Sequence, residues 1–311
     1  MVTSGDSLTR LTPIVEPWDK LGAQIGCQLW AVREDLLPFP LPGNKVRKLA
    51  AELDGLPPEV DTVVTNGAVD SNHCRTLAIM AASRGLRVHL VLHGSAGALS
   101  AGQGAALALL EGCGASWDVG PAQSIGDRIQ SAVQDLGNRG CQVHVVAGGC
   151  HTPQGARATM KAAKAVLAET TVDQIFVASG TGATQGGILA ATHSLGLSTQ
   201  VIGVSVARTS DRGAGPVRDA AAWCGVPNTE PVFVDDYRAG GYGLSNSSID
   251  LAVETGWQLG IPLDPTYTGK AMAALLDYGK KGLLADRVMF WHTGGLWNWI
   301  SGQLSISGSQ S

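Results

Sequence analysis

The chain has 311 residues, of which 44% are hydrophobic and 15% charged, and its formal net charge is −4 at pH 7. This balance excludes a disordered chain, and the length favours two domains or one large α/β unit. Without a basic stripe, the charge gives no basis for binding nucleic acid. No apolar run reaches the roughly 18 residues that a membrane-spanning helix needs, so we expect no membrane partner.

The six cysteines show neither a CxxC pair nor a Cys/His spacing typical of zinc sites, so no metal is expected. Reduced, mostly buried thiols are typical of the cytoplasm. The first residues also lack the basic-then-apolar pattern of a signal peptide. We therefore expect a cytoplasmic protein.

Short apolar runs alternate with helical patterns along the chain. Strands are expected at residues 62–66, 87–92, 142–147, 174–178, 200–206, 231–234 and 288–291. Helices are expected at residues 71–84, 100–111, 123–136, 156–168 and 268–278. Strands that are apolar throughout are typical of parallel sheets covered on both faces. The alternation therefore predicts an α/β fold with open, mostly parallel twisted sheets covered by helices.

The first segment with unusual chemistry is GNKVRKL at residues 43–49. Asn44 is a good N-cap, which would place Lys45 in the first helical turn, where the helix dipole disfavours a cation. Nearby positive charge lowers the pKa of an amine, and an amine must be neutral to attack a carbonyl. The alternative is a solvated helix start with three basic residues.

The segment TNGAVDSNH at residues 65–73 also leads from a predicted strand into a helix. Ser71 can cap that helix, and Asn72 can present its amide to a ligand. His73 is expected to make a local hydrogen bond rather than to act as a base.

The segment SGTGATQGG at residues 179–187 follows a predicted strand and opens a helix. Glycines let the backbone approach a ligand closely, and a helix N-terminus offers free N–H groups to an anion. The spacing is neither GxGxxG nor GxxxxGK[ST], and no acidic residue lies about 20 residues on to hold a ribose. The segment predicts a phosphate site that is neither for a dinucleotide nor for a nucleoside triphosphate. The alternative is an ordinary tight turn.

Three weaker segments follow, and each alone favours a turn or core role. They are GGYG at 240–243, DPTYTGK at 264–270 and WHTGG at 291–295.

Taken in order, these segments resemble the family of 1-aminocyclopropane-1-carboxylate deaminase and D-cysteine desulfhydrase, which are pyridoxal-phosphate enzymes of the tryptophan synthase β-like fold type. The likeness covers nearly the whole chain and implies pyridoxal 5'-phosphate as the cofactor. We expect a large cofactor-binding domain formed by residues 1–45 and 152–311, and a small domain formed by residues 46–151. By analogy of fold, a homo-oligomer such as a dimer is expected.

The resemblance implies roles for residues around the cofactor. Lys45 would form the Schiff base, and Asn72 would hydrogen-bond the ring hydroxyl. Thr293, with Thr268 close by, would face the pyridine nitrogen. The phosphate would be held, with Lys48 nearby, by Gly180, Thr181, Gly182, Ala183 and Thr184.

On the substrate side, the resemblance implies that Ser71 contacts the carboxylate or assists proton transfer, and that Tyr242 and Tyr267 line the site. Deaminases of this family have Glu and Leu where this chain has Thr268 and Thr293, and desulfhydrases have hydroxyl residues there. A carboxylate beside the pyridine nitrogen strengthens the electron sink that opening a cyclopropane requires. We therefore expect a desulfhydrase-like α,β-elimination from a small β-substituted amino acid, which gives pyruvate, ammonia and sulfide.

Three alternatives stay open at this point. They are 1-aminocyclopropane-1-carboxylate deamination, elimination from another β-substituted amino acid such as cysteate, and a catalytically silent pyridoxal-phosphate binding protein. The chain departs from the family pattern at Asp70, at Ala183 and Gly186, and at residues 296–299. Asp70, if it faces the pocket, would repel an acidic substrate group.

Overall fold

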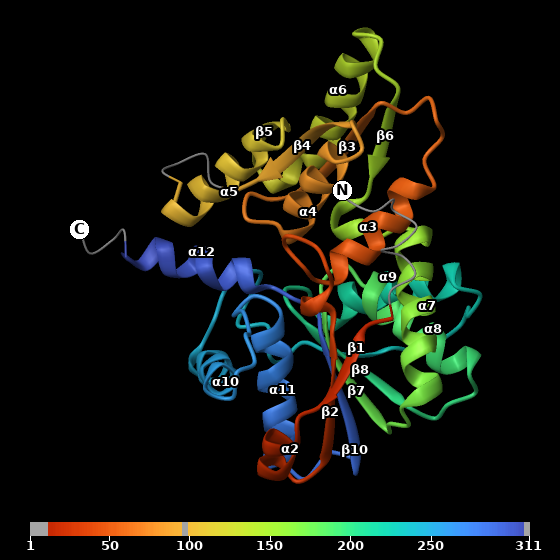
Figure 1. Cartoon of the computed structure of the whole chain (residues 1–311), viewed down its shortest axis with the longest axis vertical. Helices are drawn as coiled ribbons and strands as arrows, with labels where there is room; N and C mark the ends of the chain where they lie inside the picture. Colours follow the sequence, from red (N-terminus) through yellow and green to blue (C-terminus); the bar gives the residue numbers. More distant parts are fainter. Residues whose placement is uncertain (1–11, 95–98, 308–311) are drawn as a thin grey trace.

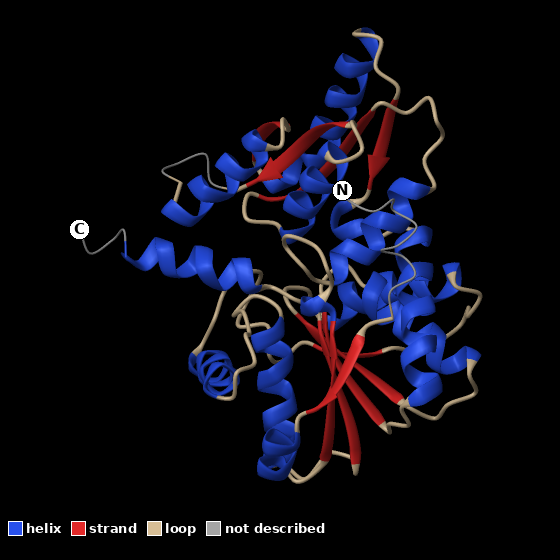
Figure 2. Cartoon of the chain, viewed as in Figure 1, coloured by secondary structure: helices blue, strands red, loops and turns tan. Residues whose placement is uncertain are grey.

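A computed structural model of the chain describes residues 12–94 and 99–307. Most of the N-terminal segment that lacks a signal-peptide pattern lies outside this described part. Within it, the strands form two separate sheets, one of six strands and one of four. The smaller sheet lies above the larger one in Figures 1 and 2.

The larger sheet has the strand order β1-β2-β10-β7-β8-β9 and is parallel except for β1, which pairs antiparallel with β2. Its strands are β1 (Ile14–Pro17), β2 (Gln28–Arg33), β7 (Gln174–Ser179), β8 (Gln200–Ser205), β9 (Val232–Val234) and β10 (Arg287–His292). Both faces are buried because alternate side chains of a strand point to opposite faces. In β7, Phe176 packs into one hydrophobic cluster, whereas Ile175 and Val177 pack into another.

Helices from different parts of the chain cover these two faces. The face of Phe176 packs on α2 (Asp19–Ile25), α10 (Ser247–Gln258) and α11 (Thr268–Lys280). The opposite face packs on α7 (Pro153–Glu169) and α8 (Ala183–Ser194), and α9 (Ser210–Trp223) lies against α8.

The smaller sheet is parallel throughout and has the order β5-β4-β3-β6. Its strands are β3 (Thr62–Ala68), β4 (Arg87–His93), β5 (Ser116–Gly120) and β6 (Val143–Val146). The associated helices are α3 (Asn44–Asp54), α4 (Asn72–Ala82), α5 (Ala101–Gly112) and α6 (Ile125–Asn138). Leu49, Leu77 and Leu110 bring α3, α4 and α5 into one core with Val63 of β3.

The predicted α/β class with mostly parallel sheets is confirmed. All four strands of the smaller sheet lie within residues 46–151, and all strands of the larger sheet lie outside that range. The exact domain boundaries stay a prediction, and α3 begins at Asn44, just before the expected boundary.

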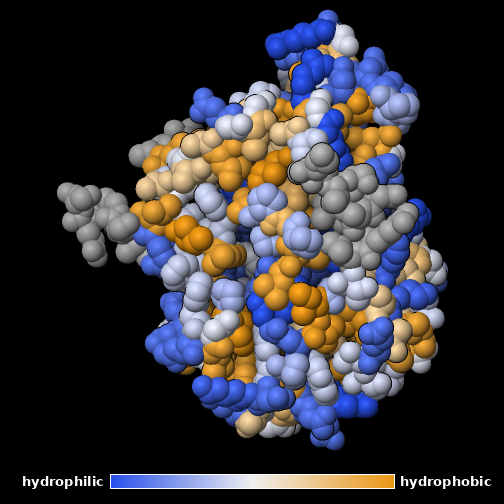
Figure 3. All heavy atoms as spheres, viewed as in Figure 1, coloured by the Kyte–Doolittle hydropathy of each residue, from blue (hydrophilic) through white to orange (hydrophobic). Residues whose placement is uncertain are grey.

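The C-terminal helix α12 (Leu296–Ser307) runs from the end of β10 across to α5 of the smaller sheet. The two helices meet closely, because a Cβ atom on Gly102 would lie 2.1 Å from the carbonyl oxygen of Ser301. Figure 3 shows hydrophobic residues along α12, where Leu296, Ile300 and Leu304 are exposed. Within the described residues, none of the helices combines the length and apolar character required to cross a membrane.

Candidate active site

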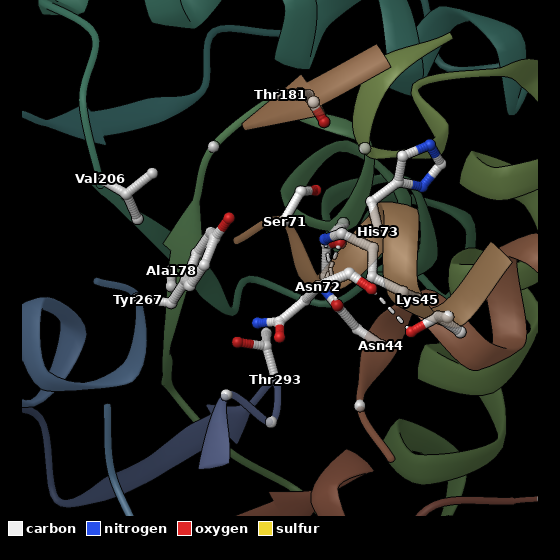
Figure 4. Close-up of a pocket in the computed structure, with 18 of the residues that line it drawn as sticks. Asn44, Lys45, Ser71, Asn72, His73, Ala178, Thr181, Val206, Tyr267 and Thr293 are labelled. Carbon is white, nitrogen blue, oxygen red and sulfur yellow. Dashed lines mark hydrogen bonds between the residues drawn. The ribbon is translucent and has the colours of Figure 1, made fainter. Parts of the chain in front are cut away.

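A cavity of about 560 Å³ lies between the two sheets. The segments that follow β3, β6, β7, β8 and β10 all contribute to its wall, so it lies at the carboxyl ends of parallel strands. Ligands of open α/β sheets bind at this edge. Figure 4 shows Lys45 and Tyr267 approaching the cavity from opposite sides, with Ser71, Asn72 and Thr293 between them.

Lys45 lies in the first turn of α3, as the sequence predicts, but the helix begins differently. The N-cap residue is Gly43, with a positive φ of +149° that favours glycine and no side-chain cap. Asn44 is therefore not the cap; its amide instead donates a hydrogen bond to the hydroxyl of Thr184, 3.0 Å away. This bond ties the start of α3 to the start of α8.

The environment of Lys45 favours the neutral amine. Burial lowers the pKa of Lys45 well below its usual value, and the charge of Lys48 lowers it further. Lys48 is itself buried and donates a hydrogen bond to the carbonyl oxygen of Gly149 at 2.7 Å. A neutral lysine amine is a nucleophile and a base, which a surface lysine at neutral pH is not.

The glycine-rich loop lines the cavity through Gly180, Thr181, Gly182 and Thr184, whereas Ala183 is fully buried behind it at the start of α8. Gly182 caps α8 with a φ of +95°, and a Cβ atom there would lie 2.9 Å from the backbone nitrogen of Val217. Only glycine fits both requirements. The free N–H groups of α8 therefore open toward the cavity.

Buried polar atoms at this loop that have no hydrogen-bond partner among the described residues include Oγ of Ser179 and Nδ1 of His151. Both residues line the cavity. His151 follows a turn at η3 (Gly148–Cys150), where a Cβ atom on Gly149 would lie 2.9 Å from the side chain of Thr181. The sequence interpretation missed this turn, although the pair of glycines after the strand at residues 142–147 gave a signal for it.

Ser71 and Asn72 stand at the start of α4 and both line the cavity. Ser71 caps α4, as predicted, by accepting a hydrogen bond from the backbone of Cys74 at 3.4 Å. The side-chain oxygen of Asn72 accepts a hydrogen bond from Arg75, which leaves its amide nitrogen for a ligand. His73 makes the predicted local bond, 2.8 Å long, to the hydroxyl of Thr65.

Tyr242 and Tyr267 come from separate segments and meet at the cavity. Their hydroxyl oxygens are 2.9 Å apart, and the rings pack edge to face. Burial raises the pKa of both phenols, so both stay protonated at neutral pH. The ring of Tyr267 also lies 6.0 Å from the Lys45 amine. The pair can donate a hydrogen bond or a proton near Lys45.

Thr293 lines the cavity, but Thr268 does not face it. The hydroxyl of Thr268 donates to the carboxylate of Asp264 at 2.8 Å and accepts from the backbone of the same residue at 2.9 Å. Asp264 therefore holds the Thr268 hydroxyl within the turn before α11, and the expected place of Thr268 close to Thr293 stays a prediction.

The cavity wall carries positive and neutral polar groups. Among the described residues, no Asp or Glu side chain lines it, and Asp70 does not line it either. The basic residues of the wall are Lys45, Lys48, His73, Arg75, His93, His151 and Arg208. Such a wall suits ligands with more than one anionic group.

Comparison with known proteins gives a consistent result. The family described as pyridoxal-phosphate dependent enzyme matches residues 7–294. The chain is 32% identical to a D-cysteine desulfhydrase of Yersinia enterocolitica, over 93% of each protein. It is 29% identical to a putative 1-aminocyclopropane-1-carboxylate deaminase of Pyrococcus horikoshii, over 90% of each. A solved structure of an ACC deaminase homologue superimposes with a TM-score of 0.85 at 26% identity and covers 99% of both chains.

Proposed function

Because the chain belongs to the family of pyridoxal-phosphate dependent enzymes, in the group of the two relatives above, we propose that it is a D-cysteine desulfhydrase-like lyase. With D-cysteine, the reaction consumes one water and releases sulfide, pyruvate and ammonia. The observation that carries this proposal is the position of Lys45, an amine of lowered pKa that shares one cavity with the glycine-rich loop and a protonated tyrosine pair.

The residues of the cavity fit the cofactor. Its phosphate matches the open start of α8 beyond Gly182 and the unpartnered oxygen of Ser179. Lys48 would balance part of the phosphate charge, Asn72 would hold the ring hydroxyl, and Thr293 would face the ring nitrogen. When bound, pyridoxal phosphate supplies an electron sink for negative charge at the substrate α-carbon.

Lys45 is proposed to hold the cofactor and to remove the α-proton of the substrate. Both tasks need a neutral amine at neutral pH. The buried position and the neighbouring charge of Lys48 provide this state.

Ser71 and the tyrosine pair are proposed to act on the substrate. The Ser71 hydroxyl would donate to the substrate carboxylate. The hydrogen-bonded pair of Tyr242 and Tyr267 stays protonated, so it can donate a proton to the thiolate as the bond between the β-carbon and sulfur breaks.

A threonine at position 268, where deaminases of the family have Glu, together with Thr293 at the cavity wall favours elimination over opening of a cyclopropane. A neutral hydroxyl does not hold a proton on the ring nitrogen as a carboxylate would, so the electron sink is weaker. A good leaving group such as sulfide tolerates a weaker sink. The 1-aminocyclopropane-1-carboxylate deaminase reaction is therefore our less favoured assignment.

Elimination from cysteate is a second candidate, and the charge of the cavity wall favours it. Asp70 does not line the cavity, and Arg75 and Arg208 do. The charge of Asp70 reaches Arg75 and Tyr242 from outside the wall, whereas a sulfonate in the cavity would meet the positive charge of the wall directly.

The test combines absorbance with product analysis. We expect the purified protein to show a visible band of lysine-bound cofactor that Lys45→Ala abolishes, and to release sulfide and pyruvate from D-cysteine. Lys280→Met, which removes an exposed lysine of α11, is the matched control and should behave as wild type. Lack of a band after addition of pyridoxal phosphate would reject the proposal.

A band without sulfide would direct the assay to cysteate, with sulfite as product, and to 1-aminocyclopropane-1-carboxylate, with 2-oxobutanoate as product. A band without any product would identify a silent binding protein.

We also propose a cytoplasmic homo-oligomer. All six cysteines are free, which suits a reducing compartment. Relatives of this fold support the oligomer by analogy.

A further inference from the structure

The loop that presents Tyr242 has a strained backbone. It connects β9 to α10, and Ala239 has a φ of +51°, a value that costs energy for any residue other than glycine. Gly240 and Gly243 follow with φ of +88° and +70°. Such a conformation persists only where the surrounding structure holds it in place.

Lys270 of α11 provides such a hold. Its ammonium donates to the carbonyl oxygens of Arg238 at 2.8 Å and Gly241 at 2.7 Å, on either side of Ala239. The third donor reaches the carbonyl of Val206 at 2.8 Å, at the end of β8. An ammonium has three N–H donors, so these three carbonyls use all of them.

The ammonium has no carboxylate partner to explain its burial. Lys270 is fully buried, and among the described residues no Asp or Glu lies within ion-pair distance of it. Burial lowers its pKa to about 8, with Asp264 opposing this change and Arg238 adding to it. The charged, three-donor form therefore still predominates at neutral pH.

We propose that Lys270 is a positioning residue that fixes the loop of residues 238–243 so that the Tyr242 hydroxyl meets that of Tyr267. Tyr267 is the N-cap residue of α11, three residues before Lys270. The same helix end thus fixes one tyrosine directly and the other through two carbonyls of its loop. Val206, on the third contact, also lines the cavity.

Limited proteolysis tests directly whether Lys270 holds the loop. The peptide bond after Arg238 is a trypsin site, and its carbonyl is one of the three acceptors of Lys270. In the cofactor-loaded enzyme, we expect Lys270→Met to increase the rate of cleavage after Arg238 by about tenfold or more, since a looser loop opens more often. Lys280→Met, at the exposed end of α11, is the control and should leave that rate unchanged. Cleavage within twofold of wild type in a folded Lys270→Met protein would overturn the proposal.

A double-mutant cycle shows whether Lys270 acts through Tyr242. This arm rests on the proposed function, whereas the proteolysis arm does not. We expect Lys270→Met to lower kcat/KM for D-cysteine by about tenfold, and the double variant with Tyr242→Phe to be no slower than Tyr242→Phe alone. Additive losses would overturn the positioning role, even if the loop is loosened.

Lys270→Gln is the gentler variant should Lys270→Met fail to fold. Its amide keeps two N–H donors, so the proposal requires the same effects at smaller size. The wild type could fail to turn over D-cysteine and still resist trypsin at Arg238. That result would reject the proposed function but would not contradict the role of Lys270 in holding the loop.

Discussion

Lys45 and Lys48 lie one helical turn apart, and their pairing sets the chemistry of the site. Burial disfavours the charged form of both amines, and the charge of the fully buried Lys48 further disfavours the ammonium form of the half-buried Lys45. The result is a lowered pKa for both residues. Lys48 keeps one fixed acceptor, the carbonyl of Gly149, whereas Lys45 makes a bond of 3.2 Å to Asn44 and faces the cavity.

Lys48→Met should raise the pKa of Lys45, because it removes a neighbouring positive charge that disfavours the ammonium. A smaller fraction of Lys45 would then be neutral at pH 7, and formation of the lysine imine would need a higher pH. The rate of imine formation in cofactor-free protein, measured against pH, gives the midpoint. Pyridoxal without its phosphate is the probe, since loss of a phosphate contact would otherwise confuse the result.

Lys280→Met is again the matched control and should leave the midpoint in place. An unchanged midpoint in Lys48→Met would mean that burial alone sets the pKa of Lys45.

Individual residues were predictable from the sequence where a local rule applied. A lysine in the first turn of a helix breaks the dipole rule, and this marked Lys45. The cap at Ser71 follows from residue type. Asn44 and Thr268 have equally good local rules, yet other partners decide what they do. Asn44 binds Thr184, which is distant in the sequence, whereas Thr268 binds the nearby Asp264, whose carboxylate is fully buried. Such partners are far apart in sequence or depend on burial.

At the scale of elements, the start of α8 is fixed by close packing against its neighbours. A Cβ atom on Gly187 would lie 2.6 Å from the carbonyl oxygen of Ala156 in α7. A Cβ atom on Gly186 would lie 2.5 Å from the Cβ atom of Ala220 in α9. The two glycines therefore let α8 approach both helices, and this approach places its free N–H groups at the cavity.

Gly187→Ala should lower the free energy of unfolding by roughly 1–3 kcal/mol, the usual cost of overpacking, because the backbone of α7 has to move. Gly104→Ala in α5 is the control. A Cβ atom there meets nothing within 4 Å, so higher helix propensity should stabilise the protein by up to about 1 kcal/mol. Urea denaturation measures both, and equal effects of the two substitutions would contradict the packing argument.

Most of the strands that the sequence analysis found have long buried runs, although the short, partly exposed β6 and β9 were also predicted. The strands β3, β4, β7, β8 and β10 are apolar over most of their length and were predicted within one or two residues at most ends. It missed β2, which lies inside the larger sheet, and it also missed β1 and β5, which are edge strands with partly exposed side chains. Their sequences, IVEP and SWDVG, mix polar and apolar residues too briefly to show a period.

For the whole molecule, the cavity is made by both sheets, and neither half of the site is complete alone. Lys45, Ser71 and Asn72 stand on helices packed with the smaller sheet, whereas the glycine-rich loop and Thr293 follow strands of the larger one. The sequence predicted each segment but not their arrangement, because parallel strands of one sheet come from distant parts of the chain. From the sequence, only the resemblance to a known family predicted that these segments form one site.

Removal of the cofactor should therefore destabilise the whole molecule rather than one part of it. A ligand that binds only the folded state stabilises it by about 2.7 kcal/mol at a hundred times its Kd. We expect the cofactor-free protein to unfold several degrees lower, and Tm to rise with added pyridoxal phosphate. Lys45→Ala should show a smaller rise, since it loses the covalent link and keeps the phosphate contacts.

Calorimetry with and without the cofactor distinguishes this arrangement from a site that belongs to one sheet. If elements of both sheets hold the ligand, every unfolding transition of the loaded protein should move to higher temperature together. If one transition moved and another stayed in place, the cofactor would be bound by the elements of a single sheet. That result would contradict our assignment, in which Lys45 and Asn72 bind the cofactor from one side and the loop before α8 binds it from the other.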